Sequence, residues 1–393
     1  MKFRMIWVGS EGEPDHQPSL PQGTGAPDSL SRVRYEQRGT EMVRRDELPN
    51  GRVKFTPIAN FTARIVNDIV CDDDTELRRD FCIEANVAGQ RVTCVVPAAE
   101  FSRMNWVPHQ LGPQAIIYPG QQQHVRAAVQ SLSGPIQQER VFTYLGWTKP
   151  GQNWVYMHAG GAVGPSGTLA HSQVRVPAPL QHYRMCPPAD SDRAKAVRSS
   201  LSFLSVAPDR ISLPLFAAVY RAPLGGADFS LFLTGRTGTF KTALAALCQQ
   251  HFGAAMDATC LPAHFASTAN ALEELAFCAK DALLVVDDFA PTGGVGDGAL
   301  YAVAERLFRA SGNHQGRGRM HGHRHLGDSR PPRSLILATG EEVPRGHSLR
   351  ARLSQVRRGR LDRAFLTAGT STGLAEPMTR APFPEVRPRR SAK

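Results

Sequence analysis

Two hydrophobic patterns divide the chain. Between residues 53 and 97, turns separate short segments rich in β-branched and aromatic residues, namely residues 53–55, 61–66, 81–85 and 91–97. Alternation with a period of two predicts half-buried strands. From residue 189 onward, continuous apolar runs of strand length are separated by apolar residues at helical spacing. That order predicts an α/β domain built on a parallel sheet, preceded by a β-rich domain.

The second pattern contains three predicted strands and five predicted helices. The strands are residues 230–234, 283–286 and 334–341. The first helix starts at Asp190 or Ser191 and has Val197, Leu201 and Leu204 at helical spacing. The other four are residues 213–220, 241–252, 267–281 and 299–310. Serine or threonine before an apolar, acidic first turn, as at Ser267 and Thr268, is typical of a helix start.

Composition predicts the domain boundaries. Residues 1–50 are expected to be a partly disordered leader, because residues 10–30 are rich in Pro, Gly, Ser and Gln. Residues 51–188 form the predicted β-rich domain, and its last part, residues 160–188, resembles an interdomain connection in its Gly and Pro content. Residues 189–365 form the α/β domain, and residues 366–393 read as a disordered basic tail.

Charge and length narrow the functional class. The chain has 393 residues and a formal net charge of +11, which favours a polyanionic partner, nucleic acid first. No apolar run reaches membrane-spanning length and the first residues lack the apolar core of a signal peptide, so a cytoplasmic protein without membrane contact is expected. Seven cysteines without a C-x-x-C pair favour reduced thiols over disulfides or structural zinc.

A glycine-containing turn follows the predicted strand at residues 230–234. The phosphate-binding loop pattern is Gly, four residues, Gly, Lys, then Ser or Thr. Gly235, Lys241 and Thr242 fit this pattern, but Phe240 stands where the second Gly belongs. The predicted ATP-binding residues are Gly235, Thr237, Gly238, Thr239, Lys241 and Thr242. Lys241 would reach the β- and γ-phosphates, and the Thr242 hydroxyl would bind Mg²⁺.

Two carboxylates end the next buried strand. Asp287 and Asp288 follow four aliphatic residues, and the carboxyl ends of strands in open α/β sheets face the ligand crevice. The spacing predicts that Asp287 holds Mg²⁺ with Thr242 and that Asp288 orients the attacking water. Thr339, near the end of the strand at 334–341, is the expected γ-phosphate sensor. An arginine at 350 or 352 could reach a neighbouring subunit's phosphates.

Three other features allow competing interpretations. Asp72 to Asp74 favour a solvated turn over a metal site. Trp106, Trp147 and Trp154 favour core packing over stacking on single-stranded nucleic acid. Residues 311–333 are basic and rich in glycine and histidine, which suits a solvated loop or a loop that contacts nucleic-acid phosphates better than a metal site.

The order of these motifs resembles an uncharacterised P-loop ATPase family encoded with primases and helicases on phages and other mobile elements. That family is similar to AAA+ ATPases, in particular the minichromosome-maintenance-like helicases. The resemblance extends from about residue 60 to residue 357. It rests on Phe61, Asp72–Asp74, Trp106, Gly146-Trp147, Trp154, the loop, Ser267-Thr268, Asn270, Leu272-Glu273, Asp287-Asp288, Thr339-Gly340-Glu341, Ser348 and Ala351-Arg352.

The resemblance implies a DNA-acting ATPase, helicase-like, that forms a homo-oligomer and works beside a primase. It implies that Thr339 is the sensor, that Arg352 is the arginine finger, and that residues 312–333 are an insertion that touches DNA. It also implies a helical lid, which the sequence after residue 366 does not predict.

Two alternatives stay open. A nucleotide- or DNA-binding subunit that no longer hydrolyses ATP would explain Phe240 in the loop and the missing lid. A small-molecule P-loop kinase is the third hypothesis, but the large β-rich domain disfavours it.

Overall fold

The computed structural model describes residues 33–165, 167–169, 173–186, 189–294, 296–316 and 329–357. The chain divides into two compact units, one of Met1–Asp68 and Phe81–Gln137, the other of Ile69–Asp80 and Gln138–Lys393. The predicted tail, the first 32 residues of the predicted leader and residues 317–328 of the basic tract lie outside the described residues. Among the described helices, none combines the length and the apolar character that crossing a bilayer requires.

The first unit begins with an antiparallel sheet of β1 (Val33–Arg38), β2 (Glu41–Glu47) and β3 (Val53–Ala59). Sequence patterns predicted only the third of these strands. The α-helices α1 (Ala98–Phe101) and α2 (Gln122–Ser131) belong to the same unit, as does a π-helical segment at Val107–Leu111. Val125, Ala128 and Val129 of α2 are buried in the core of this unit.

A second sheet has the order β12-β7-β4-β5-β6. Its strands are β4 (Phe61–Asp72), β5 (Leu77–Val87), β6 (Gln90–Pro97), β7 (Gln137–Phe142) and β12 (Gln173–Val174). The strands predicted at residues 61–66, 81–85 and 91–97 are thereby confirmed, because alternating burial along β4 to β6 follows the alternating sequence.

A small four-stranded sheet in the second unit has the order β11-β10-β9-β8. It consists of β8 (Gly146–Thr148), β9 (Val155–His158), β10 (Gly161–Gly164) and β11 (Gly167–Leu169). The interpretation of residues 160–188 as a plain connection was therefore wrong. Glycines here form the ends and turns of short strands, as where Gly164 pairs with Gly167 across a hairpin, so glycine content indicated turns and not a linker.

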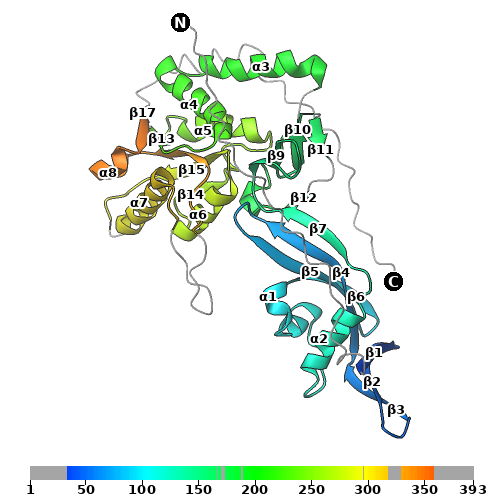
Figure 1. The fold of residues 1–393 in the computed structure, drawn as a ribbon. Coiled ribbons are helices and arrows are strands. Elements are labelled where there is room, and N and C mark those ends of the chain that lie inside the picture. The colour runs from blue at the N-terminus through cyan, green and yellow to red at the C-terminus, as the bar shows by residue number, and fades with distance from the viewer. Residues whose placement is uncertain are drawn as a thin grey trace, which may run out of the picture. The chain divides into compact units, whose positions relative to one another are not determined.

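The larger sheet of the second unit is parallel throughout, with the order β14-β15-β16-β13-β17 (Figure 1). Its strands are β13 (Ser230–Thr234), β14 (Ala263–His264), β15 (Leu283–Phe289), β16 (Leu335–Gly340) and β17 (Leu353–Arg357). This confirms the α/β class and the strands predicted at 230–234, 283–286 and 334–341. The central position of β16, between β13 and β15, brings three polar strand ends together.

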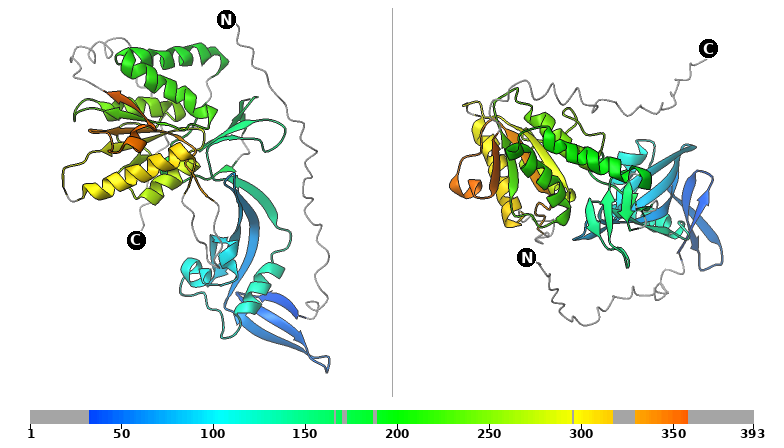
Figure 2. Two further views of the ribbon diagram at one scale, coloured as in Figure 1. Left: turned by 60° about the vertical axis from the view of Figure 1, so that its left-hand side comes forward. Right: turned by 90° about the horizontal axis from the view of Figure 1, so that it is seen from above.

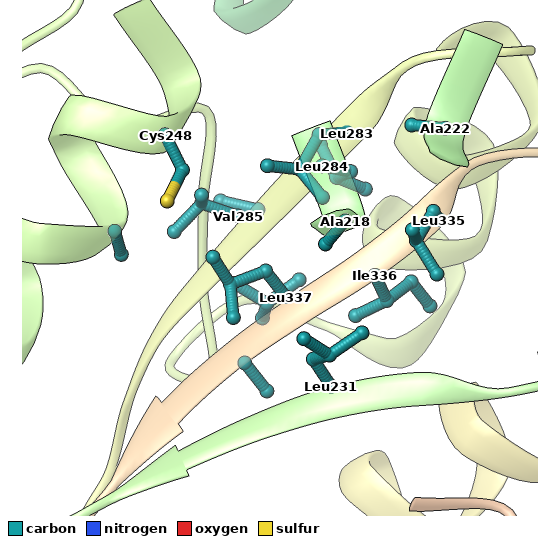
Figure 3. Close-up of a cluster of buried hydrophobic side chains, with 14 of the residues drawn as sticks. Ala218, Ala222, Leu231, Cys248, Leu283, Leu284, Val285, Leu335, Ile336 and Leu337 are labelled. Carbon is teal, nitrogen blue, oxygen red and sulfur yellow. The ribbon is translucent and has the colours of Figure 1, made fainter. Parts of the chain in front are cut away.

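Helices cover both faces of this sheet (Figures 1 and 2). On one face lie α4 (Asp209–Arg221) and α5 (Lys241–Gln249), and on the other lie α6 (Ala269–Cys278) and α7 (Asp297–Asn313). The short helix α8 (His347–Arg350) precedes β17. Buried aliphatic residues of β13, β15 and β16 pack with Ala218 of α4, with Ala222 directly after α4, and with Cys248 of α5 (Figure 3). Burial on both faces explains the continuous apolar runs.

One predicted packing face was wrong. Helix α3 (Arg193–Leu201) forms as expected, yet Val197 and Leu201 are exposed. The chain changes to a 3₁₀ segment at Ser202–Ser205, and there Phe203 becomes the buried residue. A 3₁₀ helix has about three residues per turn, so side chains in it point in other directions than an α-helix would give them. The α-helical spacing therefore predicted the wrong residues as buried.

Candidate functional site

The turn between β13 and α5 contains two residues with left-handed backbone conformation. Phe240 adopts a left-handed conformation with φ 60° and ψ 28°, immediately before α5, and Gly238 has φ 75°. A side chain with Cβ costs about 1–2 kcal/mol in this region, which is why the pattern usually has glycine there. Phe240 is 54% exposed. The loop therefore keeps its shape with Phe240 in place.

Lys241 folds back over this turn. Its Nζ donates to the carbonyl oxygens of Gly235 at 2.7 Å and Arg236 at 3.0 Å. The Thr239 hydroxyl also donates to the Arg236 carbonyl at 2.7 Å. An ammonium group thus lies beside the loop at the N-terminus of α5, where helix N–H groups favour anions.

Asp287 is the centre of a three-element cluster. This carboxylate is buried at the end of β15, and burial requires hydrogen-bond donors. The Thr242 hydroxyl of α5 donates to its Oδ1 at 3.1 Å and is 3.3 Å from its Oδ2, and the Thr339 hydroxyl of β16 donates to Oδ1. The structure therefore brings together three of the predicted site residues.

Asp288 lies beside this cluster on a distorted strand. The pairing of β15 with β16 shifts register between Val286 and Phe289, and Asp288 has φ 69°. Its backbone N–H donates to the Thr339 hydroxyl at 3.2 Å, and its side chain is exposed. A bulge of this kind redirects one side chain of a strand, here the second carboxylate, toward solvent.

The start of the loop also borders a hollow of about 450 Å³. Arginines 236, 345, 350 and 357 contribute to its wall, as do Glu341 and Glu342. The Thr237 hydroxyl donates to the Glu341 carboxylate, and the Thr234 hydroxyl donates to the Glu341 carbonyl at 3.0 Å. Sequence reasoning missed this role of Glu341, although its position two residues after Thr339 at the same strand end was a signal.

Arg352 is not brought to the cluster. Its guanidinium donates to the Asn313 side-chain oxygen at the end of α7, from Nε at 3.1 Å and from Nη2 at 2.7 Å. A role at a neighbouring subunit's phosphates would need a second copy of the chain, so that role stays a prediction.

All three aspartates of the Asp-rich turn are ion-paired, and Asp72 and Asp73 are buried while Asp74 is exposed, so the interpretation as a solvated turn was wrong for the first two. Asp72 accepts from Arg140 Nη2 at 2.6 Å, Asp73 pairs with Arg330, and Asp74 pairs with Arg333 Nη1 at 3.2 Å. These arginines lie far from the turn in sequence, so no local pattern indicated the pairing.

The environment of Asp73 shifts its acidity. Burial alone would raise the pKa of Asp73, but hydrogen bonds from Thr75, the Glu76 backbone N–H and Arg330 outweigh burial and lower that pKa to about 2. Because Arg330 and Arg333 neutralise these carboxylates, the two arginines serve the fold at the C-terminal end of the basic tract.

The Thr242–Asp287 pair fits a magnesium ion that takes its other ligands from water and phosphate. A hydroxyl and a carboxylate oxygen 3.1 Å apart can share one cation, and Mg²⁺ is commonly held by one or two such protein ligands with substrate phosphates. The described residues contain no group of three or more His, Cys, Asp or Glu suited to an all-protein metal site.

Comparisons with known proteins add little. No protein-family model matches the chain, and no curated protein matches it. A solved structure described as "SCCmec type IV Cch - active helicase" is similar, with a TM-score of 0.45 and 13% identity. The likeness covers 85% of this chain and 60% of that one, so the chain spans about three-fifths of that protein's length. Likeness at this level establishes no shared activity.

Proposed function

We propose that the second unit binds ATP with Mg²⁺ and hydrolyses it, and that the protein acts on DNA in a helicase-like manner. One observation carries the proposal: Lys241, Thr242, Asp287 and Thr339 converge at the carboxyl ends of neighbouring parallel strands. Ligands of open α/β sheets bind at that edge.

Each side chain has a distinct task in this proposal. Lys241 and the loop N–H groups bind the phosphates, and Thr242 with Asp287 holds the metal ion. Bound Mg²⁺ neutralises charge that develops on the transferred phosphoryl group. The exposed carboxylate of Asp288 accepts a hydrogen bond from the attacking water and orients it. Thr339, which donates to Asp287 and accepts from the Asp288 backbone N–H, senses the γ-phosphate.

The conformation of Phe240 bears on the hydrolysis-deficient alternative. That hypothesis rests on Phe240 in the loop and on the missing helical lid, and the structure bears on the first of these. Phe240 holds the left-handed conformation, and Lys241 and Thr242 follow it with contacts to the Gly235 carbonyl and to Asp287, which supports a loop that forms without the second glycine. Geometry therefore favours a working loop over a degenerate one.

DNA as the partner is supported by the net charge of +11 and by the resemblance described above. Arg330 and Arg333 are excluded from the proposed DNA contacts because they pair with Asp73 and Asp74. A homo-oligomer with Arg352 acting in trans, and a primase partner, are further parts of the proposal.

Steady-state ATP hydrolysis with Mg²⁺, with and without single-stranded DNA, tests the proposal. The Lys241→Ala variant should lose turnover and weaken binding of a fluorescent ATP analogue. Asp288→Asn should bind the analogue normally and lose about 10²- to 10⁴-fold in turnover, the usual contribution of a general base. Lys195→Ala, which removes an exposed lysine from α3, is the matched control.

Unchanged turnover in Lys241→Ala would refute the assignment of the site. Binding of the analogue by the wild-type protein without any turnover would instead support the hydrolysis-deficient alternative.

A further inference from the structure

One face of the small sheet carries a row of large side chains. Trp147 of β8 is paired with Tyr156 of β9, and Tyr156 is paired with Val163 of β10. The rings of Trp147 and Tyr156 meet edge to face, with centroids 5.3 Å apart. Cross-strand neighbours share one face of a sheet, so the three side chains form a continuous apolar surface.

This surface borders an open hollow of about 530 Å³, which Trp154, Met185 and Pro223 also line. Trp154 is 58% exposed and Trp147 is 38% exposed. The expectation of core packing holds for Trp106, which is buried, and is wrong for the other two tryptophans. Two exposed indole rings at one hollow are unusual, because large apolar patches on a protein surface generally mark a binding site.

Trp147 is fixed in place before any ligand arrives. Its indole Nε1 donates to the Pro223 carbonyl at 2.8 Å, and its backbone N–H donates to Asp281 Oδ2 at 3.1 Å. The Tyr156 hydroxyl donates to the Asp281 carbonyl at 2.8 Å. Since the indole N–H is already satisfied, what Trp147 offers to a ligand is ring surface, and the ring loses little freedom on binding.

The charges around the hollow indicate the kind of ligand. None of the residues that line the hollow is charged, but Lys149 lies two residues after Trp147 and Arg184 directly precedes Met185 in the sequence. Asp281, the carboxylate that contacts Trp147, is itself buried. Aromatic rings with cations at neighbouring sequence positions suit the bases and phosphates of a single strand. Aromatic grooves also bind proline-rich peptides, but the proline-rich C-terminal stretch of this chain is basic and would be repelled.

We propose that Trp147 and Trp154 form a stacking site for single-stranded nucleic acid, with Lys149 and Arg184 contacting its phosphates. The inference deepens the proposed action on DNA and rests on it, but it is independent of ATP hydrolysis. Each stacked base commonly contributes about 1–3 kcal/mol, or roughly a factor of 5 to 150 in affinity.

Fluorescence anisotropy of labelled dT20, measured without nucleotide at fixed salt, tests the site. Trp154→Ala should weaken binding by about tenfold, and Trp154→Leu should do the same because it keeps apolar bulk but lacks a ring. Trp154→Phe should remain within about threefold of wild type. Leu213→Ala, which removes an exposed apolar side chain from α4, is the control and should have no effect.

A second probe separates stacking from charge. An abasic oligomer of the same length keeps the phosphates and lacks the bases, so it should bind wild type and Trp154→Ala equally. Titration with rU20 assigns the site to RNA if it binds more tightly than dT20, and to DNA if it binds more weakly; Trp154 dependence with either supports the site.

Equal dT20 binding by wild type and Trp154→Ala would overturn the inference, as would equal weakening of the abasic oligomer. Competition by a proline-rich peptide, without any effect of Trp154 on dT20 binding, would reassign the hollow to peptides. Trp154-dependent binding of dT20 without ATP turnover would support this site and refute only the proposed hydrolysis. DNA-stimulated turnover with no dependence of dT20 binding on Trp154 would support the hydrolysis and refute this site.

Discussion

Glycine at position 240 is expected to make the protein more stable than alanine does. Both variants lose the phenylalanine ring, but only alanine keeps a Cβ in the left-handed conformation at φ 60°. That conformation costs a residue with Cβ about 1–2 kcal/mol, and the extra freedom of glycine in the unfolded chain offsets about 0.4–1 kcal/mol. The Phe240→Gly variant should therefore exceed Phe240→Ala by about 0.5–1 kcal/mol in free energy of unfolding.

A second pair of variants reverses the sign. Leu247 is a half-exposed residue within α5, at ordinary helical φ and ψ. There alanine is preferred over glycine by about 1 kcal/mol, so Leu247→Gly should be less stable than Leu247→Ala. Urea unfolding of all four variants, followed by far-ultraviolet circular dichroism, compares the two sites in one protein. Equal or greater stability of Phe240→Ala relative to Phe240→Gly would refute the left-handed assignment.

The same variants distinguish a working loop from a degenerate one. In a working loop Phe240 keeps its left-handed conformation when ATP binds, so the backbone strain there is the same in free and bound protein and cancels in the affinity. Phe240→Gly should change the Kd of a fluorescent ATP analogue by less than about threefold, or 0.7 kcal/mol. A gain of about tenfold or more would show that phenylalanine holds the loop away from its binding conformation.

Three further predictions follow from individual contacts. The pKa of Asp73 in the folded protein is lowered to about 2 from 3.8. Its ionised form therefore contributes about 2 kcal/mol to the free energy of unfolding above about pH 4, and this contribution is lost as the pH falls toward 2. Urea midpoints should fall more steeply between pH 4 and pH 2 for wild type than for Asp73→Asn. Thr268 caps α6 by accepting from the Ala271 N–H at 3.3 Å, so Thr268→Ala should lower the unfolding free energy by about 1 kcal/mol, and Thr268→Ser should not. Thr339→Val removes a donor from buried Asp287, so thermal unfolding should show a loss of about 1–3 kcal/mol that Thr339→Ser largely restores.

The parallel sheet was predictable because its strands are buried on both faces. Continuous apolar runs such as residues 283–286 leave no other simple interpretation between two helices. The polar residues directly after those runs then had to emerge at one edge, which is how Asp287 and Thr339 were identified from the sequence. Their direct hydrogen bond was not predictable, since it depends on β16 lying beside β15.

Exposure of aromatic residues was harder to predict. Trp106 and Trp154 occur in similar surroundings in the sequence, yet the first is buried and the second is largely exposed. Both tryptophans have a large apolar ring, so residue type alone favours burial for both. What decides is which other segment covers each ring, and that is a property of the folded chain. A sequence pattern therefore identifies large apolar residues better than it identifies those that remain open to a ligand.

The Asp-rich turn shows why long-range ion pairs escape sequence reasoning and what this one does. Asp73 and Arg330 are 257 positions apart, and three adjacent aspartates alone indicate solvent. In the fold, Arg330 and Arg333 anchor the chain just before β16 begins at Leu335. That strand carries Thr339 at its other end, in the cluster with Asp287. The turn therefore fixes the residues that lead into β16, the strand on which the proposed sensor Thr339 lies. Breaking the Asp73–Arg330 pair should disturb the position of Thr339 and also lower the free energy of unfolding.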